Sequence, residues 1–406
     1  MDCREFIRLS KEWKKDVCIF GAGEFGSNDG YEILKEAGFH ISFYCDNKKY
    51  GEYRNGLTVY SADHLEEFKN DILCIVAVYG VAGDEIVRQL NEMEVKNIYR
   101  LSEGSAYREL PQYLDELKNP DLIAMFPYIM DDKIVLERRF RMRIGKKPNF
   151  NKPRTFNEKI QWMKLYDRQP LYTLLADKYM VKKYVSEKIG AQYVIPTLGV
   201  WNSFDDIDFE SLPNKFVLKC THDSGSVVFC RDKKEFDYDF SKKRLETALQ
   251  RNYFWLDREW SYYGIPKRII AEEFIEPEDN KELPVDYKVH CFGGEPKYIQ
   301  TITERNVLKH TAKQNIYDFN WGLLPWGFGE YPDYPDGFER PVCLDEMYRI
   351  CRKLCEGLRY VRIDFYITDG QLKFGEFTFY PAGGYYVHND YWSEEVDNML
   401  GDEIII

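Results

Sequence analysis

The chain has 406 residues, enough for two or three domains that each bury a hydrophobic core. Its 68 Asp and Glu residues outnumber the 56 Lys and Arg residues, and the formal net charge of -12 disfavours nucleic acid as a partner. Ten cysteines occur without a secretory leader, and no apolar stretch reaches the ~18 residues that cross a bilayer. We therefore expect a cytoplasmic protein with reduced thiols and no transmembrane segment.

Apolar runs that predict strands alternate with amphipathic helical patterns over the first hundred residues. The predicted strands cover residues 17–20, 41–45, 72–78 and 98–101, and the helices between them cover 30–37, 65–69 and 85–93. This alternation predicts a parallel sheet, and thus a Rossmann-like nucleotide-binding domain over residues 1–103. Residues 104–150 indicate a helical connector. Its basic run at 138–143 suits either a solvated helix face or a surface for an anionic substrate or a membrane.

A glycine-rich loop of the dinucleotide-binding type follows the first predicted strand. Gly21, Gly23 and Gly26 have the spacing Gly-x-Gly-x-x-Gly, and Asp46 stands 20 residues beyond Gly26, at the end of the next predicted strand. Such glycines let the backbone approach a pyrophosphate, and the acid can accept hydrogen bonds from ribose hydroxyls. The loop predicts a nucleotide or nucleotide-sugar ligand. The alternative is a turn that simply requires small residues.

The second domain, residues 151–406, mixes helical patterns with short strands, which predicts an α+β fold with helices beside an antiparallel sheet. The predicted strand 215–219 ends in Lys219 and leads into a loop of mostly small residues. The loop contains His222, Ser224, Gly225 and Ser226. A lysine beside such a loop can clamp nucleotide phosphates, because ammonium and backbone amide groups both reach them. A plain β-hairpin is the alternative.

A second candidate site lies near the carboxyl end of the chain. Arg362 and Asp364 share one face of the predicted strand 360–367, and a tight turn leads to the predicted strand 371–378. This hairpin can place Asp364 near Glu376. Two close carboxylates pair with cations, become protonated, or hold Mg²⁺ under a polyphosphate. The alternative is a solvated sheet face.

Four short sequence motifs, called phrases below, occur within residues 151–406. Their order and spacing together are specific. They cover residues 152–159, 177–179, 361–365 and 375–378. In these phrases the sequence resembles the TupA-like branch of the ATP-grasp superfamily, which is associated with bacterial teichuronopeptide and other cell-surface polysaccharide loci. The resemblance implies an ATP-grasp fold over residues 151–406 and an ATP-dependent carboxylate–amine ligase.

The resemblance also implies which residues bind the nucleotide. Lys178 and Lys219 would contact the ATP phosphates, with the loop 222–226 closing over them. The backbone of an interdomain segment would meet the adenine ring, with Glu272 at the adenine amino group. That segment consists of Glu272, Glu273, Phe274 and Ile275.

For catalysis, the resemblance implies that Asp364 and Glu376 hold Mg²⁺, while Arg362 stabilises charge on the transferred phosphoryl group or on a tetrahedral intermediate. Lys288 occupies a place where many relatives have a phosphate-binding or substrate-binding arginine. Thr378 stands where many relatives have a metal-binding asparagine. The lysine for the γ-phosphate is not assigned, and Lys309 and Lys313 are its candidates.

The expected reaction uses ATP and Mg²⁺ to join an amino acid to a uronic-acid sugar or peptide through an acyl-phosphate. Its partners are small-molecule or saccharide carboxylates and amines, while peripheral association with envelope-synthesis machinery and homo-oligomerisation are left open. An alternative is a glycosyltransferase that uses a nucleotide-sugar, which the Rossmann-like pattern and the 16% aromatic content also suit. Its Asp-x-Asp candidates are residues 206–208 and 237–239. A non-catalytic scaffold is the third possibility.

Overall fold

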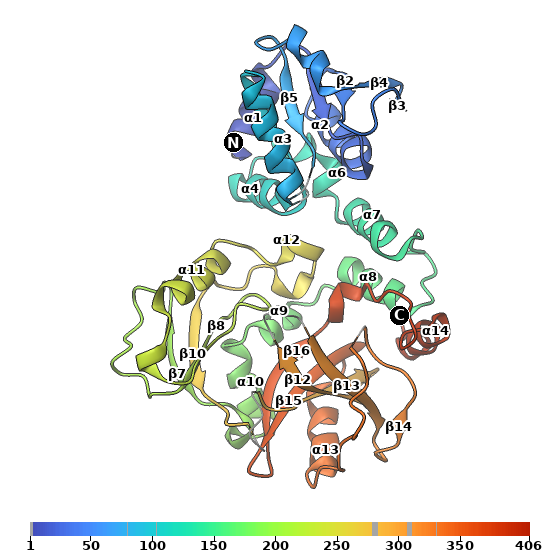
Figure 1. Cartoon of the computed structure of the whole chain (residues 1–406). Helices are drawn as coiled ribbons and strands as arrows, with labels where there is room; N and C mark the ends of the chain where they lie inside the picture. The colour runs from blue at the N-terminus through green and yellow to red at the C-terminus, as the bar shows by residue number, and fades with distance from the viewer. Residues whose placement is uncertain (1–2, 79, 103, 278–282, 307–310, 330) are drawn as a thin grey trace. The chain divides into compact units, whose positions relative to one another are not determined.

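The computed structural model describes residues 3–78, 80–102, 104–277, 283–306, 311–329 and 331–406 (Figure 1). The chain forms two compact units, Met1–Leu136 and Glu137–Ile406. Helix α7, Asp132–Ile144, runs across the division between them. Among the described residues, no helix is long and apolar enough to cross a bilayer.

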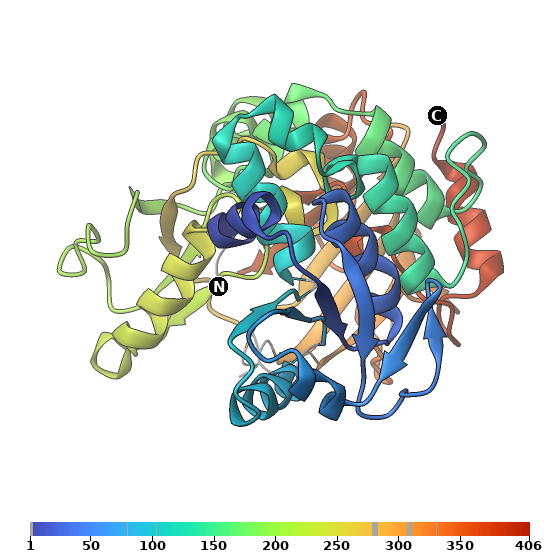
Figure 2. The ribbon, with the colours of Figure 1, turned by 90° about the horizontal axis from the view of Figure 1, so that it is seen from above.

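The first unit is built on a sheet with the strand order β3-β4-β2-β1-β5-β6. All neighbouring strands from β4 to β6 are parallel, and they lie side by side in Figure 2. The strands are β1 Val17–Phe20, β2 Ile41–Cys45, β3 Tyr53–Arg54, β4 Leu57–Tyr60, β5 Leu73–Val76 and β6 Asn97–Arg100. The helices are α1 Cys3–Glu12, α2 Tyr31–Glu36, α3 Gly80–Glu92, α4 Leu110–Leu117, α5 Pro120–Ala124 and α6 Pro127–Met130. The predicted parallel sheet is therefore confirmed.

The second unit contains two sheets where the sequence predicted one. The smaller sheet has the order β7-β10-β8-β9, and the larger has the order β14-β13-β12-β11-β15-β16. The strands of the smaller sheet are β7 Thr197–Trp201, β8 Phe216–Cys220, β9 Val228–Cys230 and β10 Ile269–Glu273. Those of the larger sheet are β11 Asp286–Phe292, β12 Glu295–Asn306, β13 Thr311–Asp318, β14 Leu323–Leu324, β15 Tyr360–Thr368 and β16 Gln371–Thr378. All of these strand pairs are antiparallel.

Helices cover one face of each sheet in the second unit. Leu245 of α11 packs on Phe216 and Leu218 of β8, and Met347 of α13 packs in the core of the larger sheet. The remaining helices are α8 Phe156–Tyr166, α9 Pro170–Ala176, α10 Met180–Ile189, α11 Tyr238–Leu249, α12 Phe254–Asp257, α13 Leu344–Leu354 and α14 Glu394–Glu403. Lys288, Arg362 and Asp364 share one face of the larger sheet with Phe292 and Tyr360, and Phe156 of α8 packs against the rings of Phe292 and Tyr360.

Hydrogen bonds of helix α8 connect three segments of the second unit. Thr155 caps its first turn, where the Thr155 hydroxyl accepts from the Glu158 amide and the Glu158 carboxylate accepts from the Thr155 amide. The buried Asn157 side chain donates to Tyr386 O at 2.9 Å and to Asp397 Oδ2 at 3.1 Å. Its own oxygen accepts from the Tyr386 amide at 2.9 Å. One amide group thus connects α8, the segment after β16 and helix α14.

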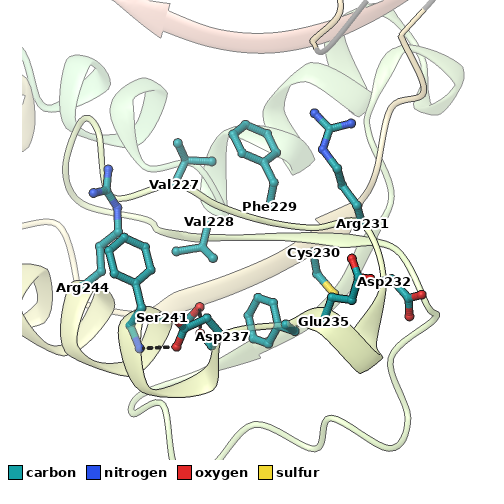
Figure 3. Close-up of a pocket in the computed structure, with 12 residues that line it drawn as sticks. Val227, Val228, Phe229, Cys230, Arg231, Asp232, Glu235, Asp237, Ser241 and Arg244 are labelled. Carbon is teal, nitrogen blue, oxygen red and sulfur yellow. Dashed lines mark hydrogen bonds between the residues drawn. The ribbon is translucent and has the colours of Figure 1, made fainter. Parts of the chain in front are cut away.

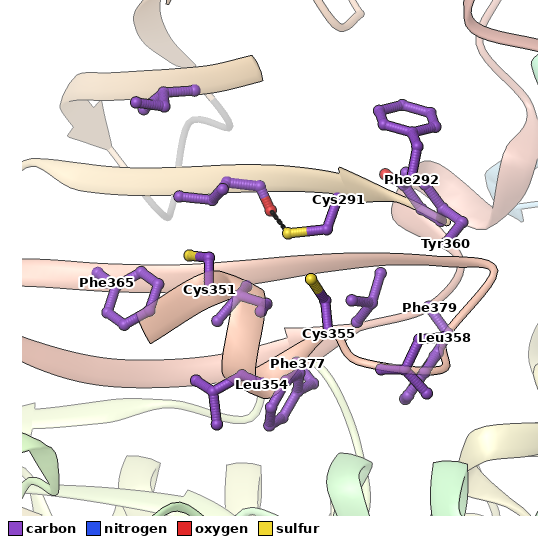
Figure 4. Close-up of a cluster of buried hydrophobic side chains, with 14 of the residues drawn as sticks. Cys291, Phe292, Cys351, Leu354, Cys355, Leu358, Tyr360, Phe365, Phe377 and Phe379 are labelled. Carbon is purple, nitrogen blue, oxygen red and sulfur yellow. Dashed lines mark hydrogen bonds between the residues drawn. The ribbon is translucent and has the colours of Figure 1, made fainter. Parts of the chain in front are cut away.

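Cysteine side chains contribute to both cores. All ten cysteines lie among the described residues without a disulfide, and only Cys3 is not fully buried. Cys291, Cys351 and Cys355 meet between β11 and α13, among aromatic side chains such as Phe365 (Figure 4). In the first unit, the thiols of Cys18, Cys45 and Cys74 lie together on β1, β2 and β5, and burial raises the pKa of Cys18.

Candidate active site

The smaller sheet presents Lys219 on the face opposite its helix. Phe216, Leu218 and Cys220 of β8 are buried against α11, so the alternation of a strand directs Lys219 to the other face. There Lys219 Nζ lies 2.5 Å from Glu272 Oε2 of β10. Lys182 of α10 lies 2.7 Å from the other oxygen of Glu272. Burial raises the pKa of Glu272, but Lys219 and Lys182 outweigh this effect and hold that pKa below its usual value.

Lys178 connects the two halves of the predicted site. Its backbone amide donates to Thr221 O at 3.1 Å, and its ammonium group donates to Asp223 O. The same ammonium group lies 3.9 Å from Glu376 Oε2 of β16. Lys178 therefore contacts both the loop after β8 and a carboxylate of the larger sheet.

The loop 222–226 has a fixed base and an exposed tip. His222 is buried, and its Nε2 lies 3.2 Å from Ala248 O and 3.1 Å from Arg251 O, near the end of α11. Burial lowers the pKa of His222, which favours the neutral ring. Ser226 Oγ donates to Asp223 Oδ1 at 2.5 Å and accepts from the Cys220 amide. His222 and Ser226 thus shape the loop, while Ser224 and Gly225 lie exposed at its tip.

The segment predicted to bind adenine begins at the end of β10. Glu272 is held between two lysines, as described above, while the side chain of Glu273 is exposed. The Phe274 ring lies 6.4 Å from that of Phe229, an exposed side chain of the edge strand β9. Ile275 follows Phe274 and is half-buried. An apolar surface therefore borders the ion-paired Glu272.

The predicted hairpin pairs the two carboxylates across adjacent strands. Asp364 of β15 lies opposite Glu376 of β16, and Arg362 lies opposite Thr378. Arg362 donates to both Asp364 oxygens at 2.7 and 2.8 Å, and Lys288 of β11 lies 2.5 Å from Asp364 Oδ2. Burial opposes ionisation of Asp364, but Arg362 and Lys288 together lower its pKa to about 2. Arg362 also lies 3.5 Å from Glu376 Oε1 and donates to the Thr378 hydroxyl.

The donor set restricts how Mg²⁺ can be held here. Within the described ranges, no group of three or more His, Cys, Asp or Glu side chains is arranged to hold a metal ion. Asp364 and Glu376 supply two carboxylates, and Arg362 already contacts both. Mg²⁺ commonly takes one or two protein carboxylates and completes its shell with phosphate oxygens and water. The residues therefore fit a metal shared with a nucleotide but not a site made of protein ligands alone.

Two cations of this region were missed by the sequence analysis. Lys182 contacts Glu272, and Arg305 of β12 lies 2.9 Å from Asp286 Oδ2, beside Lys288. Lys182 lies four residues after Lys178, which was the available signal, but Lys178 lies between α9 and α10, and a lysine on a helix such as α10 usually points to solvent. Of the candidates for the γ-phosphate, Lys313 pairs with Glu304 at 2.9 Å, and Lys309 lies outside the described residues.

The glycine loop of the first unit is stabilised by its own acid. Asp46 Oδ2 accepts from the Ala22 amide at 2.9 Å, and Oδ1 accepts from the amides of Lys48 and Lys49. Gly21 has a φ of +114°, and a Cβ atom at Gly26 would lie 1.9 Å from the Gly21 carbonyl oxygen. The turn itself requires glycine at these two positions. At Gly23, a Cβ atom would meet no described atom within 4 Å.

A surface pocket lies between β9 and the start of α11, and Val227, Phe229, Arg231 and Arg244 are among the residues that line it (Figure 3). Ser241 and Asp237 close its helical side through a hydrogen bond of 2.6 Å. None of the residues predicted to bind ATP or Mg²⁺ lines this pocket.

In the second unit, one antiparallel sheet carries a lysine beside a loop of mostly small residues, and the other carries paired carboxylates. Residues 158–405 match the family model of the TupA-like ATP-grasp proteins, and the chain belongs to this family. The protein is therefore an ATP-dependent ligase that joins a carboxylate to an amine. No match was found among curated proteins.

Several solved structures are similar to this chain at low identity. The ATP-grasp ligase PsnB, complexed with a minimal precursor, has 10% identity over 96% of this chain and 98% of its own, with a TM-score of 0.34. D-alanine-D-alanine ligase from Helicobacter pylori has 16% identity over 61% and 69%, with a TM-score of 0.31. The Bacillus anthracis ligase of the same name, complexed with ATP, has 14% identity over 90% and 86%, with a TM-score of 0.31. The family assignment is based on the sequence match and not on these likenesses.

Proposed function

We propose that the protein activates a carboxylate with ATP as an acyl-phosphate and transfers the acyl group to an amine. The observation that carries this proposal is the position of Lys178. Its ammonium group contacts the loop after β8 through Asp223 O and lies 3.9 Å from Glu376 on the larger sheet. A single cation therefore meets both the loop suited to phosphates and the carboxylate suited to their metal ion.

In this proposal, the smaller sheet binds the nucleotide. Lys178 and Lys219 neutralise phosphate charge, and the exposed tip of the loop at Ser224 and Gly225 covers the phosphates. The adenine ring lies along the backbone from Glu272 to Ile275, and Phe274 and Phe229 supply apolar surface. Glu272 exchanges one of its lysine partners for a contact with the adenine amino group.

The larger sheet carries the chemistry. A substrate carboxylate oxygen attacks the γ-phosphorus, the bond from that phosphorus to the β–γ bridging oxygen breaks, and ADP leaves with the electron pair. Arg362 and Lys288 stabilise the negative charge that develops during this transfer. When bound, Mg²⁺ supplies further charge neutralisation at the phosphates, and Asp364 and Glu376 would hold it, with Thr378 beside them.

For the substrates, we propose an amino acid as the amine and a uronic-acid sugar or peptide as the carboxylate, in cell-surface polysaccharide biosynthesis. The resemblance of the four phrases supports this choice, and aromatic rings such as Tyr385 and Tyr386 suit sugar faces. We place the reaction in the cytoplasm. The segments 1–103, 104–150 and 151–406 would act as nucleotide-binding domain, connector and ligase.

The first unit is proposed to bind a nucleotide or nucleotide-sugar at Gly21, Gly23 and Gly26. The open space at Gly23 supports this proposal, whereas Asp46 already accepts three backbone hydrogen bonds. A thermal-shift series with UDP-sugars and with ATP, each with Mg²⁺, tests it. A shift with UDP-sugars that is lost in Gly23→Val supports a ligand here, and no shift with any nucleotide-sugar contradicts it.

The deciding experiment is ADP release screened across pairs of uronic acids and amino acids, with phosphate and amide measured in parallel. Equal amounts of ADP, phosphate and amide are expected, because each acyl-phosphate is consumed by one amine. Sugar transfer from a nucleotide-sugar without ATP turnover would instead establish a glycosyltransferase. If ATP and Mg²⁺ do not change the melting temperature of the protein, the non-catalytic scaffold would be favoured instead.

Replacing Lys219 by methionine is expected to weaken ATP binding by about tenfold or more, since a hydrogen bond to a charged group contributes about 1.5–3 kcal/mol. Glu272 keeps Lys182 as its partner, so this variant retains a paired buried carboxylate. Titration calorimetry with ATP and Mg²⁺ measures the effect. Lys243→Met, on an exposed position of α11, is the matched control. Equal affinity of wild type and Lys219→Met would remove Lys219 from the nucleotide site.

A further inference from the structure

The ammonium group of Lys288 lies between two buried carboxylates of the larger sheet. Lys288 Nζ is 2.5 Å from Asp364 Oδ2 of β15 and 3.6 Å from Asp286 Oδ2 at the start of β11. Asp286, Lys288 and Asp364 are each 6% exposed or less. Asp286 and Lys288 are two residues apart on one strand, so their side chains lie on the same face. The proposed site uses Asp364 and leaves Asp286 without a role.

The Asp364 carboxylate is already occupied by cations. Arg362 donates to its two oxygens at 2.7 and 2.8 Å, and Lys288 shares Oδ2 with Arg362. A metal ion held by Asp364 would lie close to both cations and would repel them. Metal binding at Asp364 is therefore favoured if one of these cations has another carboxylate to which it can move.

Lys288 is the cation better able to leave Asp364. Arg362 binds Asp364 through two parallel hydrogen bonds, donates to the Thr378 hydroxyl at 3.0 Å and lies 3.5 Å from Glu376 Oε1. A planar guanidinium group with several partners is held in one geometry, whereas an ammonium group on a flexible four-carbon stem can turn. Lys288 has one short contact, to Asp364, and its second carboxylate is already near.

Asp286 is suited to receive an ammonium group. Its Oδ2 accepts from Arg305 Nη1 at 2.9 Å, so the buried carboxylate has a partner before Lys288 reaches it. The Arg305 side chain is 46% exposed and stays in contact with water. A carboxylate offers about four acceptor positions, so Asp286 can bind Lys288 without losing Arg305.

We propose that Asp286 is a positioning residue that receives the Lys288 ammonium group when a nucleotide-bound metal ion is held by Asp364. This assignment rests on the proposed function. After the move, Lys288 uses one hydrogen for Asp286 and keeps two for the phosphoryl group. Without Asp286, Lys288 either stays on Asp364 or becomes a buried charge with no carboxylate partner, and both alternatives oppose metal binding.

The test measures how strongly Mg²⁺ promotes ATP binding. Titration calorimetry with ATP, in the absence of any substrate carboxylate, gives one dissociation constant in EDTA and another at saturating Mg²⁺. The ratio of the two constants is the metal coupling. Asp286→Asn is expected to lower this coupling by about tenfold, the effect of losing one hydrogen bond to a charged group. Its dissociation constant in EDTA should stay within about threefold of wild type, which a general loss of structure would not allow.

A double-mutant cycle separates the proposed role from a simple charge effect. In Lys288→Met, no ammonium group has to leave Asp364, so adding Asp286→Asn is expected to change the metal coupling by less than about twofold. Lys288→Met leaves Asp364 paired with Arg362 and Asp286 paired with Arg305. A tenfold loss in both backgrounds would mean that Asp286 acts through its own charge, and the assignment would be wrong. Unchanged coupling in Asp286→Asn alone would overturn it too.

Glu295→Gln, at the start of β12, is the control for loss of a carboxylate, because Glu295 is exposed and pairs with Arg352 on the surface. Its metal coupling should equal that of wild type, and a tenfold loss in this control would contradict the assignment. If wild type does not bind ATP, the proposed function fails together with this assignment. If wild type binds ATP equally well with and without Mg²⁺, only the assignment of Asp286 fails.

A structure of the wild-type protein keeps the proposal testable if Asp286→Asn does not fold. Crystals grown with Mg²⁺ and an ATP analogue that cannot be hydrolysed are expected to show Lys288 Nζ within about 3.2 Å of an Asp286 oxygen and no longer in contact with Asp364. A Lys288 ammonium group that still contacts Asp364 in this complex would refute the exchange.

Discussion

Replacing Glu376 by glutamine is expected to lower the rate of ATP-dependent ligation by about 100-fold, which corresponds to about 3 kcal/mol of lost transition-state stabilisation. Glu376 lies opposite Asp364, and its side chain is 34% exposed, so it is the carboxylate that a metal–nucleotide complex can reach. It also lies near Lys178 and Arg362. The substitution removes one carboxylate ligand of the proposed metal ion. It also removes the negative charge that positions Lys178 and Arg362.

The measurement is ADP release at increasing Mg²⁺ concentration. Because Glu376 is only partly buried, the variant should fold, whereas removal of Asp364 would leave Lys288 and Arg362 buried without their main partner. Glu356→Gln is the matched control, because Glu356 is exposed and pairs with Lys188 on the surface. A wild-type rate in Glu376→Gln would show that the metal is held elsewhere.

Replacing Asn157 by alanine is expected to lower the free energy of unfolding of the second unit by about 3 kcal/mol or more. The variant loses the hydrogen bonds of the side chain to Tyr386 and Asp397, and these buried groups stay out of water. Burial already raises the pKa of Asp397, and the contacts with Asn157 oppose this effect. Without Asn157, the Asp397 carboxylate is buried with less compensation.

Urea denaturation followed by circular dichroism measures this loss. Asn398→Ala is the control, because the Asn398 side chain donates to Glu394 O on the exposed side of α14. A change of less than about 1 kcal/mol in Asn157→Ala would mean that the three segments are held together by apolar packing. The ligase activity of Asn157→Ala is expected to fall only in proportion to the loss of folded protein.

Much of the fold could be predicted from the sequence, because buried strands leave a strong pattern. The apolar runs of β1 and β2 begin and end where predicted, and β16 also has the predicted bounds. By contrast, β13 has the sequence Thr-Ala-Lys-Gln-Asn-Ile-Tyr-Asp, whose polar residues do not alternate with apolar ones. It becomes a strand because β12 and β14 pair with it. A pairing that depends on neighbouring strands leaves little local signal.

Some contacts of the candidate site could likewise be predicted from the sequence, and others could not. The tight turn after β15 predicted that the hairpin can place Asp364 near Glu376, and the two residues are cross-strand partners in β15 and β16. The partners of Glu272 could not be predicted, because Lys182 looks like any lysine on a solvated helix until α10 meets β10.

The motif residues at 155–159 show that a recognisable motif can have a structural role instead of a catalytic one. Thr155 and Glu158 cap α8, while Asn157 connects two remote segments. None of these side chains contacts Lys178, Lys219 or Asp364 in the described structure. We interpret this part of the family resemblance as a requirement of the architecture on which the site is built.

The buried cysteines make it possible to time the opening of each unit separately. Cys18, Cys45 and Cys74 lie in the first unit, and Cys291, Cys351 and Cys355 lie in the second. A thiol reagent can modify them only when the surrounding core opens, so the modification rate under native conditions measures the free energy of that opening. Mass spectrometry of the modified peptides then separates the two sets. The native thiols thus report on the opening of each core, and no further cysteine has to be introduced by mutation.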